Sequence, residues 1–159
     1  MKIAAFCGTF DPVTYGHLDI IERAAKIFDV LYVTIAIHPT KVGLFSIEKR
    51  KELLKEATAH LDNVIVDSTD ELSMDYVKKV NGKVLIRGLR STTDFDYELQ
   101  YAQSNQYLND TIETMYLMTK PSHSFISSSV VKEMASYHKE LTGLVPPCVE
   151  EALKEKYTK

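Results

Sequence analysis

Residues 8–17 have the composition of a loop that binds phosphate groups. Gly8 and Gly16 allow the backbone to approach a ligand closely. His17 would begin a helix, where unpaired N–H groups and the positive end of the helix dipole favour an anion. The loop matches neither the pattern G-x-x-x-x-G-K-S/T nor the pattern G-x-G-x-x-G, because it ends in Thr14-x-Gly16-His17. We therefore predict an anion-binding loop that differs from both of these types.

Cationic and hydroxyl side chains follow other apolar runs of the chain. Arg87 and Arg90 can each hold phosphate oxygens with a planar guanidinium, while Lys41 offers a point charge on a flexible stem. A run of three serines would start another helix and present hydroxyls and N–H groups to a second anion; it comprises Ser127, Ser128 and Ser129. Taken singly, such residues are more often surface charges or helix caps, so the interpretation depends on their sharing one location.

The hydrophobic pattern predicts how these residues are positioned. Apolar runs over residues 3–6, 30–37, 64–66, 84–86 and 114–118 favour buried strands. Helical spacing predicts helices over residues 17–28, from the cap Ser46 to 60, 74–80, from Thr93 or Asp94 to 108, from the cap Ser127 to 137, and 149–157. Strands that alternate with helices indicate an α/β fold, a Rossmann-like doubly wound sheet of about five parallel strands with helices on both faces.

The two edges of this predicted sheet differ in chemistry. Ligands of open α/β sheets bind beyond the carboxyl ends of the strands. His17, Lys41, Arg87 and Arg90 all follow strands at that edge, whereas the opposite loops, such as residues 81–83, have the composition of simple turns. We therefore expect these side chains to share one rim.

Composition places limits on the class of protein. The chain has 159 residues, of which 45% are hydrophobic and 26% charged, which fits one domain with a sizeable core. A formal net charge of −3 argues against a nucleic-acid partner. Cys7 and Cys148 are too few for a disulfide framework, and no His or Cys spacing indicates a metal site. No apolar run reaches the ~20 residues of a membrane span, so we expect no membrane partner and a cytoplasmic location.

Two signatures in the chain resemble those of the T/HxGH nucleotidylyltransferases. The first is Gly8-Thr9-Phe10-Asp11-Pro12 with Thr14-x-Gly16-His17, and the second is Ile126-Ser127-Ser128-Ser129. Three further segments resemble the bacterial phosphopantetheine adenylyltransferases, namely Lys41-x-x-x-Phe45, Leu85-Ile86-Arg87-Gly88-Leu89-Arg90 and Asp94-Phe95-x-Tyr97-Glu98. The resemblance covers essentially the whole chain and implies a single nucleotidylyltransferase domain over residues 1–159.

The resemblance implies that AMP is transferred from ATP to phosphopantetheine, giving dephospho-coenzyme A and pyrophosphate by direct in-line attack. The catalytic residues implied are Thr9, His17, Lys41 and Arg90. The implied ATP contacts are Thr9, Phe10, His17, Gly88, Leu89, Arg90, Glu98, His123, Ser124, Phe125, Ile126, Ser127, Ser128 and Ser129. The implied phosphopantetheine contacts are Thr9, Lys41, Ser73 and Arg87. Mg²⁺ would be bound with ATP and not in a protein cage. The family also implies a homohexamer, and coenzyme A as a feedback ligand.

Two other functions stay open. A related enzyme would move AMP or CMP onto another acceptor, such as glycerol phosphate or nicotinamide mononucleotide. Cytidylyltransferases usually carry Arg-Thr-x-Gly-Ile-Ser-Thr-Thr where this chain has Ser124-Phe125-Ile126-Ser127-Ser128-Ser129-Val130, which argues against them. A non-catalytic nucleotide-binding module is the third alternative, and the presence of His17 and Lys41 argues against it.

Overall fold

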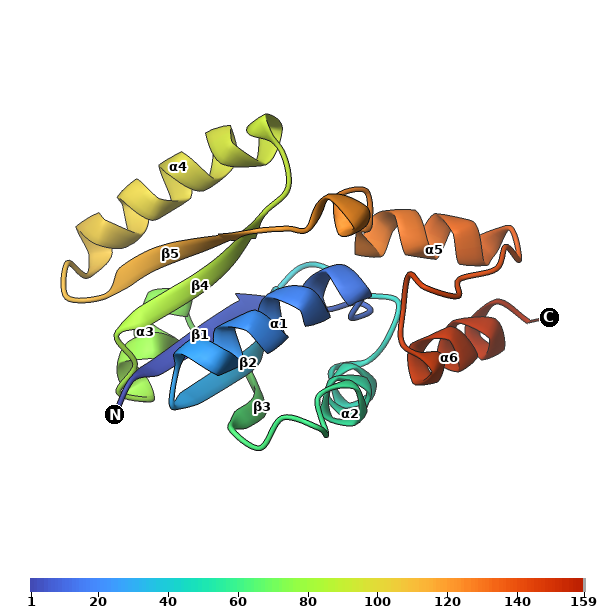
Figure 1. Ribbon diagram of the computed structural model, residues 1–159, viewed down its shortest axis with the longest axis horizontal. Coiled ribbons are helices and arrows are strands. Elements are labelled where there is room, and N and C mark those ends of the chain that lie inside the picture. The colour runs from blue at the N-terminus through green and yellow to red at the C-terminus, as the bar shows by residue number, and fades with distance from the viewer. Residues whose placement is uncertain (159) are drawn as a thin grey trace.

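The computed structural model of the protein describes residues 1–158, which form one parallel β-sheet surrounded by helices (Figure 1). The strands are β1 (Ile3–Gly8), β2 (Val30–Ala36), β3 (Val64–Thr69), β4 (Val84–Leu89) and β5 (Glu113–Met118). They lie in the order β3-β2-β1-β4-β5, and every pairing is parallel. This confirms the predicted Rossmann-like sheet. The strand order reverses between β1 and β4, which is where ligands bind in folds of this class.

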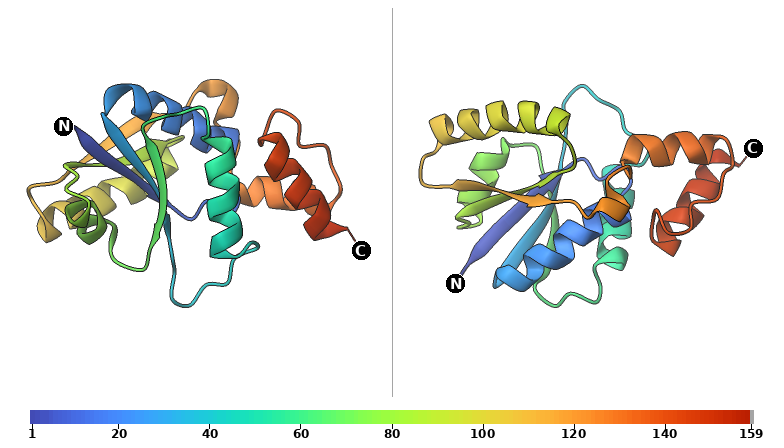
Figure 2. Two further views of the ribbon diagram at one scale, coloured as in Figure 1. Left: turned by 90° about the horizontal axis from the view of Figure 1, so that it is seen from below. Right: turned by 45° about the horizontal axis from the view of Figure 1, so that its top comes forward.

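Helices cover both faces of the sheet, while α5 and α6 lie beyond the carboxyl ends of the strands (Figures 1 and 2). They are α1 (Tyr15–Ile27), α2 (Ile47–Ala57), α3 (Ser73–Lys79), α4 (Thr92–Leu108), α5 (Ser128–Ser136) and α6 (Pro147–Tyr157), with a 3₁₀ turn, η1 (Pro121–His123), before α5. Helices α1, α2, α5 and α6 share the larger core with the sheet, and α3 packs in the smaller core on the other face. Within residues 1–158, no helix combines the length and apolar character of a bilayer span.

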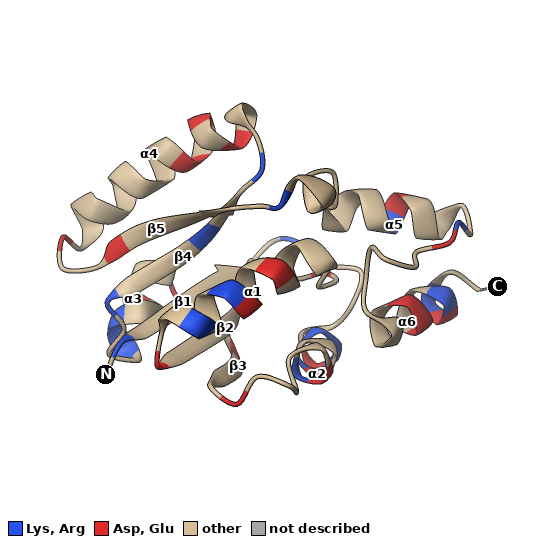
Figure 3. Cartoon of the chain, viewed as in Figure 1, with Lys and Arg blue, Asp and Glu red and all other residues tan. Residues whose placement is uncertain are grey.

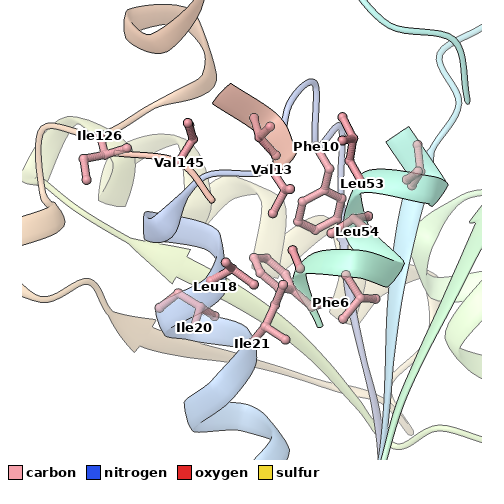
Figure 4. Close-up of a cluster of buried hydrophobic side chains, with 14 of the residues drawn as sticks. Phe6, Phe10, Val13, Leu18, Ile20, Ile21, Leu53, Leu54, Ile126 and Val145 are labelled. Carbon is pink, nitrogen blue, oxygen red and sulfur yellow. The ribbon is translucent and has the colours of Figure 1, made fainter. Parts of the chain in front are cut away.

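The alternation of side chains along β1 builds both cores. Phe6 faces the larger core, where it lies among the apolar residues of α1 and α2 shown in Figure 4. Cys7, the next residue, faces the smaller core with Met74 and Val77 of α3. Because successive residues of a strand point to opposite faces, a strand covered on both faces must be apolar at every position. The uninterrupted apolar run at the N-terminus meets this requirement.

Side-chain caps set several helix boundaries. Ser46 and Ser127 cap α2 and α5 as predicted, accepting hydrogen bonds from the backbone N–H groups of Lys49 at 3.1 Å and Val130 at 3.2 Å. The predicted start of α4 at Thr93 or Asp94 is wrong, because Ser91 accepts from the Asp94 N–H at 3.2 Å and the helix begins at Thr92.

Other boundaries also differ from the predicted ranges. Helix α2 ends at Ala57, three residues before the predicted end, and α6 begins at Pro147, since proline fits the first turn of a helix. The predicted strand over residues 84–86 continues to Leu89, because Arg87 pairs with Tyr116 and Leu89 with Met118 of β5. Arg87 therefore lies within a strand and not in the loop that follows it.

Candidate active site

A cavity of about 570 Å³ opens at the carboxyl ends of β1 and β4, at the point where the strand order reverses. Its walls come from the loop after β1, the start of α1, the end of β4, the start of α4 and the start of α5. The lining residues that the sequence predicted are Thr9, Phe10, His17, Lys41, Arg87, Gly88, Arg90, Glu98, Ile126, Ser127, Ser128 and Ser129. All four residues predicted to be catalytic therefore border one cavity.

Five residues from the predicted binding sets do not line this cavity. They are Ser73, Leu89, His123, Ser124 and Phe125. His123, Ser124 and Phe125 belong to the 3₁₀ turn and the residues after it, beside the lining residue Ile126. Ser73 begins α3, on the face of the sheet that carries the smaller core. The predicted contacts of these five residues with a ligand stay predictions.

His17 is held by the first turn of α1. Helix α1 begins at Tyr15, two residues before the predicted start, because Thr14 is the N-cap and His17 is the third helical residue. The Thr14 hydroxyl accepts from the His17 N–H at 3.4 Å, and His17 Nδ1 accepts from the Thr14 N–H at 3.0 Å. This reciprocal pair is a capping box in which histidine replaces the usual Glu or Gln. The spacing Thr14-x-x-His17 therefore fixes the orientation of the imidazole ring.

The same hydrogen bond fixes the tautomer of His17. Burial lowers the pKa of His17 from its ordinary value of 6.5 to about 4, and the positive charge of Arg90 contributes to the shift. The ring is therefore neutral at physiological pH. Because Nδ1 accepts from the Thr14 N–H, the single ring proton resides on Nε2. His17 can therefore donate a hydrogen bond into the cavity that it lines.

Close packing around the loop after β1 explains its glycines and its aromatic residue. Phe10 has a φ of +46°, a left-handed conformation that non-glycine residues adopt rarely. This conformation places the Phe10 ring edge-on to His17, with 5.0 Å between the ring centroids. A Cβ atom at Gly8 would lie only 3.3 Å from the Phe10 ring, and one at Gly16 would lie 3.3 Å from the Thr14 hydroxyl. The two glycines therefore leave room for the Phe10 ring and for the hydroxyl that caps α1.

The start of α5 forms the opposite wall. Ser127 caps α5, and the Ser128 hydroxyl donates to the carbonyl oxygen of Pro12 at 2.8 Å, which ties this helix to the loop after β1. Both α1 and α5 thus begin at the cavity, each with backbone N–H groups in its first turn. Two helix starts that face one cavity favour an anionic ligand.

Arg90 and Lys41 supply positive charge at the mouth of the cavity. Arg90 Nε donates to Asp94 Oδ2 at 3.2 Å, and Arg90 Nη1 donates to the carbonyl oxygen of Ile126 at 3.4 Å. Lys41 lies on the exposed segment between β2 and α2, and within residues 1–158 it makes no ion pair. Arg90 is therefore held in place, while the Lys41 ammonium has its charge available for a ligand.

Arg87 is engaged by other side chains. Its Nε and Nη2 donate to the two carboxylate oxygens of Glu98 at 3.0 and 2.6 Å, and its guanidinium lies 4.6 Å from the centroid of the Tyr101 ring. A bidentate pair of this kind is rigid and specific in direction. The sequence assigned Arg87 and Glu98 to different substrates, whereas the structure joins them in one ion pair.

Some lining residues were given no ligand role by the sequence reasoning. Asp11 and Lys132 both border the cavity, and Asp94, for which the sequence predicts only a helix start, pairs with Arg90. Asp11 lies inside the first signature, so its position in the motif was an available signal. Lys132 follows the serine run by three residues on an ordinary amphipathic helix, and nothing in its local pattern marks it.

The fold and the cavity define an α/β protein whose cavity, at the topological switch point, suits an anionic ligand. A family model described as cytidylyltransferase-like matches residues 5–134, so the chain belongs to the cytidylyltransferase-like family of nucleotidyltransferases.

The fold is also similar to that of a known structure. The protein from Vibrio parahaemolyticus assigned as a nicotinate-nucleotide adenylyltransferase has a TM-score of 0.77 and 18% sequence identity to this chain. The match covers 100% of this chain and 98% of the other. At this identity, the likeness establishes a shared fold over the full length.

Proposed function

We propose that the protein transfers AMP from ATP to phosphopantetheine and releases dephospho-coenzyme A and pyrophosphate. Family membership supports nucleotidyl transfer, and the segments that resemble phosphopantetheine adenylyltransferases support this acceptor. The observation that carries the proposal is the neutral, backbone-oriented imidazole of His17 in a cavity that it shares with Thr9, Lys41 and Arg90.

The reaction requires positioning and charge stabilisation. An oxygen of the acceptor phosphate attacks the α-phosphorus of ATP, the bond from that phosphorus to the β-phosphate oxygen breaks, and pyrophosphate leaves with that oxygen. The nucleophile is already ionised at neutral pH, so no general base is needed. Donors aimed at the charge that develops on the α-phosphate lower the barrier, and one such donor contributes roughly 3 kcal/mol. His17 Nε2–H, Lys41 and Arg90 would have this role.

Mg²⁺ would enter the cavity on the triphosphate, where it would neutralise phosphate charge. In the described part of the chain, no three His, Cys, Asp or Glu side chains lie together so that they could hold a metal ion. The carboxylates of the cavity wall are paired with cations: Asp11 with Arg50, Asp94 with Arg90, and Glu98 with Arg87. These residues do not suit a protein-held Mg²⁺.

A comparison of acceptors tests the proposal. Purified protein is incubated with ATP, Mg²⁺ and one of three acceptors, namely phosphopantetheine, nicotinate mononucleotide or glycerol 3-phosphate, and pyrophosphate release is measured. We expect turnover with phosphopantetheine and a product whose mass equals that of dephospho-coenzyme A. Turnover with another acceptor only would overturn the assigned substrate and retain nucleotidyl transfer. ATP binding without turnover of any acceptor would favour a non-catalytic nucleotide-binding module.

A further inference from the structure

A buried carboxylate joins the loop after β1 to the segment that carries Lys41. Asp11 Oδ2 accepts the N–H of Leu44 at 2.7 Å, and Asp11 Oδ1 accepts the N–H of Phe45 at 3.0 Å. Arg50 of α2 approaches the same carboxylate, with 3.3 Å between Nε and Oδ1. Both charged side chains are more than nine-tenths buried, at 7% and 4% exposure. Buried charges are retained where pairing and hydrogen bonds satisfy them, as they do here.

Arg50 binds both segments through their carbonyl groups. Its Nε donates to the carbonyl oxygen of Phe45 at 2.9 Å, and its Nη1 donates to that of Thr9 at 3.5 Å. The guanidinium, which is carried by α2, therefore contacts two other segments at once: the loop after β1 and the segment before α2. We call Asp11, Arg50 and the backbone of residues 43–45 the loop clamp.

Gly43 shows how tightly the loop clamp is packed. A Cβ atom at this position would lie 1.6 Å from Arg50 Nη2 and 2.6 Å from Asp11 Oδ2. No side chain fits in that space, so the backbone lies directly on the ion pair. Gly43 is the second residue after Lys41, and Asp11 is the second residue after Thr9. The loop clamp thus fixes the chain immediately beside two of the residues predicted to be catalytic.

The segment that carries Lys41 has little other support. Lys41 and Val42 are exposed, and Val42 is 99% accessible. Only two residues separate Lys41 from Leu44, whose N–H is anchored, so the ammonium can reach only points within a short radius of the loop clamp. The position of the anchor therefore determines whether Lys41 faces the cavity.

Asp11 borders the cavity, but its oxygens are committed to the protein. Oδ1 faces the Phe45 N–H and Arg50, and Oδ2 faces the Leu44 N–H and, at 3.9 Å, Lys132 Nζ. A carboxylate in these contacts is poorly placed to bind a metal ion or to accept a proton from a substrate. The geometry of the Asp11 carboxylate instead suits a role in holding the backbone at Leu44 and Phe45 in place.

We propose that Asp11 and Arg50 are positioning residues for nucleotidyl transfer, which hold Lys41 against the reacting phosphates through the backbone of the loop clamp. This inference rests on the proposed function. It predicts that loss of the loop clamp reduces turnover by way of Lys41 and not through a general loss of fold.

A double-mutant cycle tests this. The variants are Asp11→Asn, Lys41→Ala and the double variant, with Asp19→Asn as the matched control. Asp19 is also a buried carboxylate paired with an arginine, Arg23 at 3.0 Å, but neither residue lines the cavity. All variants are assayed below their unfolding temperatures. We expect Asp11→Asn to lower kcat at least tenfold in the wild-type background and less than threefold in the Lys41→Ala background. Asp19→Asn should change kcat less than threefold in both.

The proposal stands or falls on whether the effect of Asp11→Asn on kcat depends on the presence of Lys41. Equal losses from Asp11→Asn in both backgrounds, or a loss matched by Asp19→Asn, would overturn the proposal. Arg50→Lys should retain less than half of the effect of the loop clamp on kcat, since an ammonium keeps the charge but does not reproduce the planar fork.

Hydrogen exchange separates failure of this inference from failure of the proposed function. The amides of Leu44 and Phe45 should exchange at least tenfold faster in Asp11→Asn than in the wild type, and at the wild-type rate in Asp19→Asn. This readout needs no substrate. An unchanged exchange rate in Asp11→Asn would refute the loop clamp, whereas wild-type protein that releases no pyrophosphate would refute the proposed reaction.

Discussion

The neutral state of His17 predicts a specific dependence of stability on pH. The folded protein holds this imidazole at a pKa of about 4, whereas its ordinary value is 6.5. Between these two values the unfolded chain binds a proton at His17 that the folded chain does not bind. The free energy of unfolding should therefore fall as the pH falls through this window, and the contribution of His17 should be complete above pH 6.5.

The size of this effect follows from the shift. A fall of the pKa from 6.5 to about 4, at ~1.4 kcal/mol for each pH unit, corresponds to about 3 kcal/mol of stability lost on acidification. Other groups titrate in the same range, so a matched variant is needed. His17→Gln is suitable, because glutamine does not titrate and is a usual residue at the third helical position of a capping box.

Urea denaturation of both proteins at a series of pH values measures the effect. The buffers must contain no phosphate or sulfate, since an anion bound in the cavity would favour the imidazolium form. The wild type should lose up to about 3 kcal/mol relative to His17→Gln between pH 6.5 and pH 4. Nitrogen NMR should show the proton on Nε2. Parallel pH profiles for the two proteins, or a proton on Nδ1, would refute the assigned state of His17.

Three further outcomes are expected. In His17→Ala the free energy of unfolding should fall by about 1 kcal/mol, because the cap is lost, and kcat should fall at least ~100-fold. His17→Gln should keep the cap but still lose turnover. Near-normal pyrophosphate release by His17→Ala would contradict the role of the imidazole. Gly16→Ala should change stability by less than ~1 kcal/mol, because better helix propensity offsets the 3.3 Å contact of the new Cβ atom with the Thr14 hydroxyl, yet calorimetry should show weaker ATP binding. Light scattering should show that the wild type is an oligomer and that Leu99→Glu dissociates it. The reason is that α4 exposes apolar side chains and carries no charge over its last turns (Figure 3). A monomeric wild type would exclude the expected hexamer.

Much of the fold could be predicted because its signals are local. Apolar runs of the right length mark buried strands, and serines before amphipathic stretches mark helix starts. One error arose where several residues competed for one role. At α4, Ser91, Thr93 and Asp94 are all suitable caps, and only the three-dimensional structure shows that Ser91 has the extended backbone that an N-cap requires.

The site could be predicted in part. The residues of the first signature lie in a single loop, so their proximity follows from the sequence. The contacts of Arg50 do not, since its partner Thr9 lies 41 residues away and Arg50 occupies an unremarkable position on an amphipathic helix. The pairing of Arg87 with Glu98 also depends on how far β4 continues beside β5, which the apolar run over residues 84–86 understates.

The way in which His17 is held has a consequence for how this protein tolerates change. In many enzymes a histidine is oriented by the side chain of another residue, and loss of that side chain disorients the ring. Here Nδ1 is bound by the main-chain N–H of Thr14, which every amino acid except proline provides, and the Thr14 hydroxyl lies 3.2 Å from the same nitrogen. Substitutions elsewhere around the cavity can therefore alter which molecules fit without turning the imidazole. The substrate that receives the nucleotidyl group can thus change among descendants of this protein while His17 Nε2–H stays in place.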